Sequence, residues 1–162
     1  MKVVIPVLAA AIAAACVDIS AALTTQLEAR RLASAMHVEF ARASAASNRA
    51  VVADTDEASA AAAGEAREAR QAVDTNLERL RRVLVALGDG DDIRQFDAFK
   101  IRYEAYRQLD DEILPLAIEN SAADARSLSS ALGRKQLVTA QCNDQLRMLE
   151  QALAAHQSAA TR

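Results

Sequence analysis

The stretch NLERLRRVLVALGDGDDIRQFDAFKIRYEAY (76–106) decides the fold, because it holds two helical patterns separated by one turn. Apolar residues recur every three or four positions on both sides of the turn, a period that places each set on one side of a helix. Within the turn, Gly88 and Gly90 can end a helix, and Asp89 and Asp91 can cap the next one. The stretch therefore predicts two helices that fold back on each other.

The same period continues along the chain in both directions. It predicts helices over about residues 24–53, 57–87, 91–131 and 134–157, with Asp54, Thr55 and Asp56 capping the second. The expected core positions are Leu23, Leu27, Met36, Phe40, Ala43, Ser47 and Ala50; Ala66, Ala69, Val73, Leu77, Leu80, Leu84 and Leu87; Phe96, Phe99, Tyr103, Tyr106, Ile113 and Ala117; and Leu137, Leu146, Leu149 and Leu153. Short turns between such helices predict an all-α, antiparallel up-down-up-down four-helix bundle.

The third predicted helix is too long for this bundle. Its roughly 40 residues exceed the roughly 30 of the first two helices by about three turns. We therefore expect a kink or a break, most readily at Pro115, where the ring removes an amide donor and clashes with the preceding turn.

Composition supports a helical protein and excludes several functions. The 162 residues include 39 Ala but only four Gly, two Pro and no Trp, too few turn-forming residues for a fold of many strands. A net charge of -3 gives no positive field for nucleic acid. Cys16 and Cys142 are too few and too far apart for a disulfide framework or a zinc site. No CxxCH motif is present to attach haem, and no cofactor is expected.

The N-terminal residues look directed to a membrane. Residues 3–17, VVIPVLAAAIAAACV, carry no charge, and the apolar run resumes after Asp18 as far as Leu23. Residues 1–23 are thus either an uncleaved anchor, which we favour, or a cleaved signal peptide with small residues before its cut. We expect a protein of the inner membrane with residues 24–157 as a periplasmic domain and 158–162 as a disordered tail. Secretion to the periplasm after cleavage is the alternative.

Three stretches carry a family resemblance. VEFARASAASNRAVVADTDEAS (38–59), FDAFKIRYEAYRQLDDEILPLAIEN (96–120) and ARSLSSALG (125–133) resemble the four-helix-bundle sensor domain of methyl-accepting chemotaxis proteins and related sensor kinases. The resemblance implies a periplasmic ligand-binding domain that dimerises through its first helix, where some members bind dicarboxylates through arginines. The chain ends after the fourth helix, so the output domains of such receptors are not expected here.

Arg42, Asn48 and Arg49 are the candidate ligand-binding residues. The arginines project about 140° away from the core stripe of the first helix. The same outer face carries Val38, Ala45 and Val52 at intervals of seven, a second seam suited to pairing with another helix. An arginine fork matches a carboxylate, so a small carboxylate is the expected ligand. The alternative is that these arginines are solvated or paired with a glutamate one turn away.

Other polar residues have simpler explanations. Tyr103 and Tyr106 could line a ligand pocket, but their spacing favours core packing with each hydroxyl at the bundle edge. Asp110 is either buried beside an arginine or lies where the stripe drifts toward Leu109 and Ile113, and we favour drift. Asn120 and Ser121 are expected to mark a frayed or kinked turn.

No metal site and no catalytic site are expected. His37 and Glu39 lie on different sides of a helix, and His156 is expected in a disordered tail. No GxSxG, HExxH or phosphate-binding glycine loop is present, so the chain is not expected to be an enzyme.

Two functions remain open. The first is a chemoreceptor-type sensor domain, forming a homodimer, that binds a small anionic solute and relays it by helix shifts. The alternative is a structural or interaction bundle that binds no small ligand and pairs with a complete receptor through its first helix.

Overall fold

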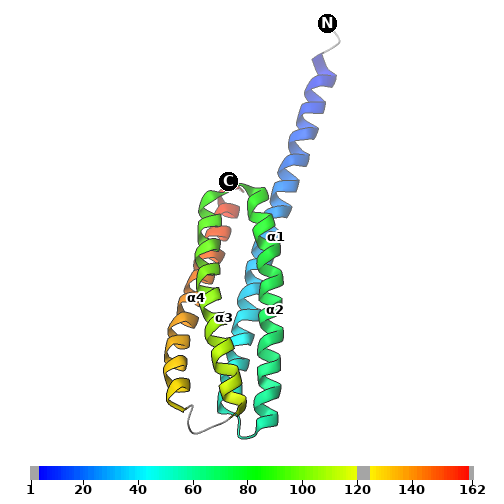
Figure 1. The fold of residues 1–162 in the computed structure, drawn as a ribbon. Coiled ribbons are helices and arrows are strands. Elements are labelled where there is room, and N and C mark those ends of the chain that lie inside the picture. Colours follow the sequence, from blue (N-terminus) through cyan, green and yellow to red (C-terminus); the bar gives the residue numbers. More distant parts are fainter. Residues whose placement is uncertain (1–3, 120–124, 161–162) are drawn as a thin grey trace.

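The computed structural model describes the backbone of residues 4–119 and 125–160, and the side chains of residues 21–119 and 128–156. Its four helices are α1 (Val4–Val52), α2 (Asp56–Leu87), α3 (Gly90–Glu119) and α4 (Ala125–Ala160). They form an all-α up-down bundle, which confirms the predicted fold class (Figure 1).

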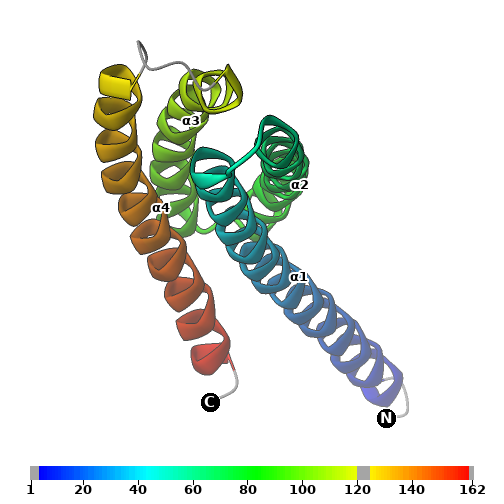
Figure 2. The same ribbon diagram turned by 90° about the horizontal axis from the view of Figure 1, so that it is seen from below.

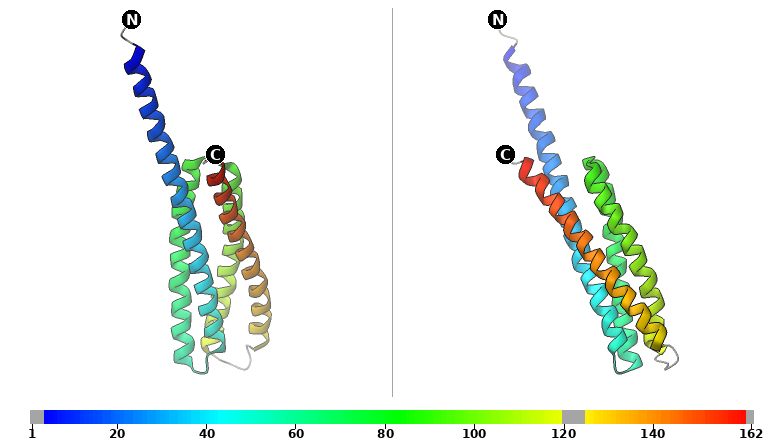
Figure 3. Two further views of the ribbon diagram at one scale, coloured as in Figure 1. Left: turned by 180° about the vertical axis from the view of Figure 1, so that it is seen from behind. Right: turned by 90° about the vertical axis from the view of Figure 1, so that its left-hand side faces the viewer.

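The bundle is built from two antiparallel helix pairs. α1 packs most extensively against α2, and α3 packs most extensively against α4 (Figure 2). Smaller contacts between α1 and α4, α2 and α3, and α1 and α3 join the two pairs. The α1–α2 turn lies at one end, whereas the α2–α3 turn and the end of α4 lie at the other (Figure 3).

Capping residues fix both turns that the structure describes. The Thr55 hydroxyl oxygen accepts a hydrogen bond from the amide of Ala58 at 3.2 Å and begins α2. Gly88 ends α2 at φ 74°, a left-handed conformation that favours glycine, and its amide donates to the Leu84 carbonyl. Asp89 then caps α3 by accepting from the amide of Asp91 at 2.8 Å. The predicted roles of Thr55, Gly88 and Asp89 are therefore confirmed, whereas Gly90 and Asp91 lie in the first turn of α3.

A serine joins three helices at the α1–α2 end. Ser59 is buried, and its hydroxyl lies 2.8 Å from the Ala50 carbonyl of α1 and 3.1 Å from the Ala117 carbonyl of α3. Because a hydroxyl has one proton, the two carbonyls share it. This contact holds α3 against the α1–α2 turn.

Aromatic rings occupy the middle of the core. Phe40 of α1 makes edge-on contacts with Phe99, Tyr103 and Tyr106 of α3, with ring centroids 6.4, 6.2 and 5.0 Å apart. Alanines and leucines fill the remaining length, including Ala43 and Leu84. The composition thus gives one broad aromatic layer between thinner layers of small side chains.

Two predicted core positions are wrong for the same geometric reason. Leu27 and Leu137 are exposed, whereas Met36 and Leu146 are fully buried. Each wrong position precedes its buried partner by nine residues, or about 900° of rotation, which puts the two on opposite sides of a helix. The helices bury Ala29 and Ala131 instead.

The end of the third helix also differs from the prediction. α3 ends at Glu119 and α4 begins at Ala125, so Gly133 lies inside α4 and does not separate the two helices. Asn120 and Ser121 lie outside the described residues. Pro115 sits on the exposed side of α3 within its last turns. There the missing amide donor interrupts little of the helix, because the helix ends four residues later.

The membrane prediction rests on the side chains of residues 1–23, and those of residues 1–20 lie outside the described part of the chain. Among the residues that the structure does describe, no helix is long and apolar enough to cross a membrane. The anchor and the cleaved signal both stay predictions for residues 1–23.

Replacing Phe40 by alanine should destabilise the fold strongly, because it opens a cavity in the aromatic layer. We expect a loss of about 3 to 5 kcal/mol in the free energy of unfolding, measured by urea denaturation. Ile101→Ala is the control, since Ile101 is exposed on α3, and it should change stability by less than about 0.5 kcal/mol. Equal losses in both variants would contradict the described core.

Candidate functional site

Two of the three predicted ligand residues, Arg42 and Arg49, lie together on the exposed side of α1. Arg42, Asn48 and Arg49 are all exposed, as the helical projection predicts. Arg42 and Arg49 both reach Glu65 of α2, so the two side chains meet over the groove between the helices. The structure thus brings the two arginines together. Nothing described places the Asn48 side chain in the same contact.

Glutamates surround these arginines. Arg42 lies 3.5 Å from Glu39, 3.5 Å from Glu65 and 3.2 Å from Glu68, and Arg49 pairs with Glu65. The hydrogen bond from Arg49 lowers the pKa of the Glu65 carboxyl. Three carboxylates therefore face two guanidinium groups, and the patch carries no excess of positive charge. Arg42 pairs with Glu39 one turn away, as the alternative prediction expects, but its other two partners, Glu65 and Glu68, belong to α2.

A hollow of about 500 Å³ adjoins this patch at the α1–α2 end. Its walls are mostly small apolar side chains, with Arg49 and Glu65 at one side. The lining residues are Arg49, Val52, Ala53, Ala58, Ala61, Ala62 and Glu65. An apolar hollow beside a paired arginine offers space for a small molecule with one charged end.

The predicted second seam of α1 is exposed in this chain. Val38 is 64% exposed and Val52 is 75% exposed, with Ala45 exposed between them. These three residues, called the outer seam below, lie at intervals of seven on one side of α1. The described chain leaves this face uncovered.

A second cluster, which was not predicted, lies inside the bundle and joins all four helices. Asp110 of α3 is fully buried and lies 2.9 Å from the ammonium of Lys135 of α4. Arg70 of α2 approaches the other Asp110 oxygen at 3.2 Å. Ser47 of α1 accepts a hydrogen bond from Lys135 and donates one to Asp110. The favoured explanation of Asp110, a drift of the stripe, is therefore wrong, and the alternative, burial beside an arginine, is confirmed.

Burial in this cluster changes the chemistry of its members. It lowers the pKa of Lys135, although the neighbouring carboxylate of Asp110 opposes this effect. The ammonium also lies 5.4 Å from the centre of the Tyr106 ring, a cation–π distance. A lysine within the apolar stripe of α4, between Ala131 and Cys142, was the sequence signal for this cluster.

The two tyrosines differ in how their hydroxyls are satisfied. Tyr103 donates to the Arg70 carbonyl at 3.0 Å and borders a hollow between α2 and α3, close to the predicted position at the bundle edge. The Tyr106 hydroxyl is buried without a hydrogen-bond partner, so the prediction of an edge position is wrong for this residue. Burial raises the pKa of both phenols.

Comparison with known proteins gives no family for this chain: no protein-family model, no curated protein and no solved structure matches it.

Removing the charge of Asp110 should cost far more stability than removing that of its neighbour. Asp110→Asn leaves Lys135 buried without its counter-ion, and we expect a loss of about 3 to 5 kcal/mol in urea denaturation. Asp111→Asn is the matched control, because Asp111 pairs with Arg70 at 2.7 Å but is exposed, and should cost less than about 1 kcal/mol. Similar losses in the two variants would show that the buried Asp110–Lys135 pair stabilises the fold no more than the pair formed by the exposed Asp111.

Stability should rise with pH as the solution approaches the ordinary pKa of lysine. The pKa of Lys135 is lowered from 10.5 in the folded chain, so the unfolded chain binds more protons between the two values. Folding is therefore favoured as pH rises through this interval. Measurements should stay below pH 9.0, the ordinary cysteine value, because burial raises the pKa of the Cys142 thiol to about 12 and stability then falls as pH rises above 9.0. The raised pKa values of the two tyrosines act in the same direction above pH 10.0. Lys135→Met should remove the rise, and a rise that persists in this variant would assign it to other groups.

Proposed function

We propose that this chain is a chemoreceptor-type sensor domain that binds a small carboxylate and relays binding by a shift of its helices. The observation that carries the proposal is topological: α1 continues beyond the bundle at the end where α4 finishes (Figure 1). In this arrangement both terminal helices are available at one end to pass a displacement onward. The family resemblance of residues 38–59, 96–120 and 125–133 supports the same proposal.

The packing of the bundle suits such a displacement. The contact between α1 and α2 is the most extensive in the bundle, and each single contact between helices of different pairs is smaller than the contact within either pair. Small translations of packed helices are an established form of switching. A ligand that contacts α1 and α2 would act on one pair and leave the other to move relative to it.

Ligand binding at Arg42, Asn48 and Arg49 must compete with existing ion pairs. A small dicarboxylate would take the place of Glu65 and Glu68 beside the two guanidinium groups. Exposed pairs of this kind are worth about 0 to 1 kcal/mol each, so the exchange is energetically accessible. The exchange would also release α2 from α1 at this level, which links binding to a helix shift.

A second function is favoured by the outer seam. Val38, Ala45 and Val52 present an apolar strip that a helix of a partner chain could cover. In this alternative the chain binds no small ligand and pairs with a complete receptor in the periplasm. The sensor proposal requires a homodimer or this heterodimer as well, so the ligand distinguishes the two functions.

Screening small carboxylates by thermal shift should identify a compound that raises the melting temperature, because it binds the folded chain alone. Arg42→Ala combined with Arg49→Ala should abolish that shift while leaving the helical circular dichroism unchanged. Arg94→Ala combined with Arg147→Ala is the control, since these exposed arginines lie on α3 and α4.

Unchanged affinity in the Arg42 and Arg49 variant would remove the proposed binding site. If no carboxylate shifts the melting temperature while a complete receptor co-purifies, and Val38→Asp with Val52→Asp abolishes that co-purification, the interaction bundle is the function.

A further inference from the structure

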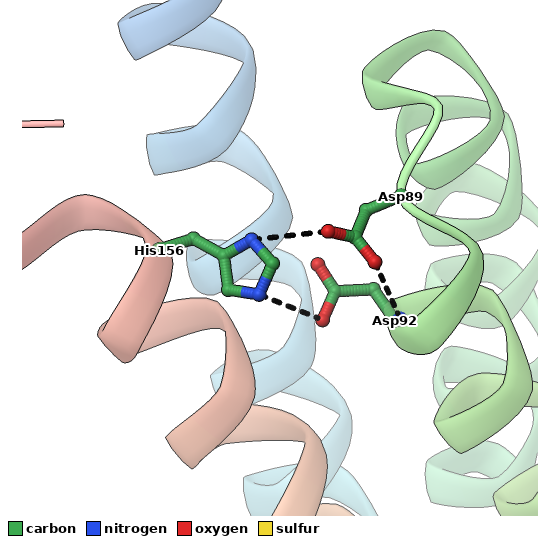
Figure 4. A group of neighbouring side chains, drawn as sticks. All are labelled: Asp89, Asp92 and His156. Carbon is green, nitrogen blue, oxygen red and sulfur yellow. Dashed lines mark hydrogen bonds and ion pairs between the residues drawn. The ribbon is translucent and has the colours of Figure 1, made fainter. Parts of the chain in front are cut away.

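Three side chains of types that can coordinate a metal ion meet at the end of the bundle where α4 finishes. Asp89 comes from the α2–α3 turn, Asp92 from the first turns of α3, and His156 from the last turns of α4 (Figure 4). His156 was expected in a disordered tail, but it lies within α4 and faces the two carboxylates. One donor atom from each residue can be chosen so that all three lie within 4.8 Å of one another.

Capping orients the first carboxylate. Asp89 Oδ1 accepts hydrogen bonds from the amides of Asp91 and Asp92 at 2.8 and 3.3 Å, which fixes the side chain at the start of α3. Its other oxygen, Oδ2, points to His156 Nδ1 at 3.3 Å. The free oxygen of a fixed carboxylate is thereby held toward the imidazole (Figure 4).

The second carboxylate is buried and lacks a hydrogen-bond partner at one oxygen. Asp92 is 2% exposed, and its Oδ1 accepts no hydrogen bond although it lies 4.0 Å from His156 Nε2. Leaving a buried acceptor unsatisfied is unfavourable, and such a group calls for a partner. The unsatisfied oxygen points into the space that Asp89 and His156 border, so a partner located there would satisfy it.

We infer that Asp89, Asp92 and His156 form a binding site for a divalent transition-metal ion such as Zn²⁺. Two carboxylate oxygens and one imidazole nitrogen are a mixed ligand set that Zn²⁺ accepts. Donors bound to one ion at about 2.1 Å and at a tetrahedral angle lie roughly 3.4 Å apart, close to the separation of Asp89 from His156. In this structure Nδ1 faces Asp89 and Nε2 faces Asp92, so binding of one ion by all three residues would require the imidazole ring to rotate, and water would complete the coordination.

A bound ion would connect α4 to the α2–α3 turn. The turn joins α2 of the first helix pair to α3 of the second, and α4 belongs to the second pair. Metal occupancy would therefore fix the last turns of α4 where α1 leaves the bundle (Figure 1). The inference does not depend on the carboxylate proposal, because the arginine patch faces a different groove.

Zinc titration of the untagged full chain tests the inference. We expect ZnCl₂ to raise the melting temperature by roughly 3 to 6 °C once free zinc is about tenfold above its Kd. His156→Ala and Asp92→Asn should each raise that Kd by roughly tenfold or more. MgCl₂ should give no shift, because Mg²⁺ prefers an oxygen-only shell and keeps its waters. All measurements are repeated in a Cys16→Ser background, since a thiolate can also bind zinc.

His37 provides the matched control. It faces a single carboxylate, Glu150, at 3.2 Å, so His37→Ala should leave the zinc response unchanged. In the wild-type chain, zinc should also move the nitrogen NMR signals of His156 and not those of His37, a readout that requires no variant to fold. The absence of any zinc shift, or equal responses in the His156→Ala and His37→Ala variants, would overturn the inference.

Discussion

The ion pair between Asp110 and Lys135 constrains the register of the whole bundle. Neither charge is stable in the interior alone, so α3 and α4 must align to within the reach of two side chains. Arg70 and Ser47 extend the same requirement to α2 and α1. An Ala-rich seam by itself would tolerate sliding by a turn, because one small apolar side chain resembles the next. The buried charges remove that freedom.

The rest of the core follows from this alignment. With the register fixed, Phe40 enters the aromatic layer of α3 on one side of the charged cluster. On the other side Ala46, Ala63 and Leu114 pack where the helices come close. The bundle thus owes its specificity to a few large or charged side chains, and its close helix approach to the many alanines. Function, in either form proposed, relies on surfaces outside this core.

Much of the fold could be predicted from the sequence, but much of the polar structure could not. Thr55 and Gly88 identify both turns by local chemistry, which needs no knowledge of tertiary contacts. The prediction that Leu27 lies in the core was wrong because the apolar stripe of α1 was continued over the nine residues to Met36 without allowing for the rotation of the helix. The pairing of Asp110 with Lys135 was not predicted, because each charge looks misplaced in its helix until the other is brought beside it. His156 and Asp92 are distant in sequence, and their approach depends on where α4 begins, which lies at 125 and not at 134.

The shared hydroxyl proton of Ser59 has a mechanical consequence. It holds α1, α2 and α3 together at the end remote from the α4 terminus, so that end would be the pivot of the proposed helix shift. A rigid helix hinged there acts as a lever arm, and a tilt of a few degrees near Ser59 becomes a displacement of several ångströms at the opposite end. Thirty residues of helix give such an arm a length of about 45 Å. In the proposed sensor, a small local rearrangement near Ser59 would therefore give a larger displacement at the opposite end of the bundle.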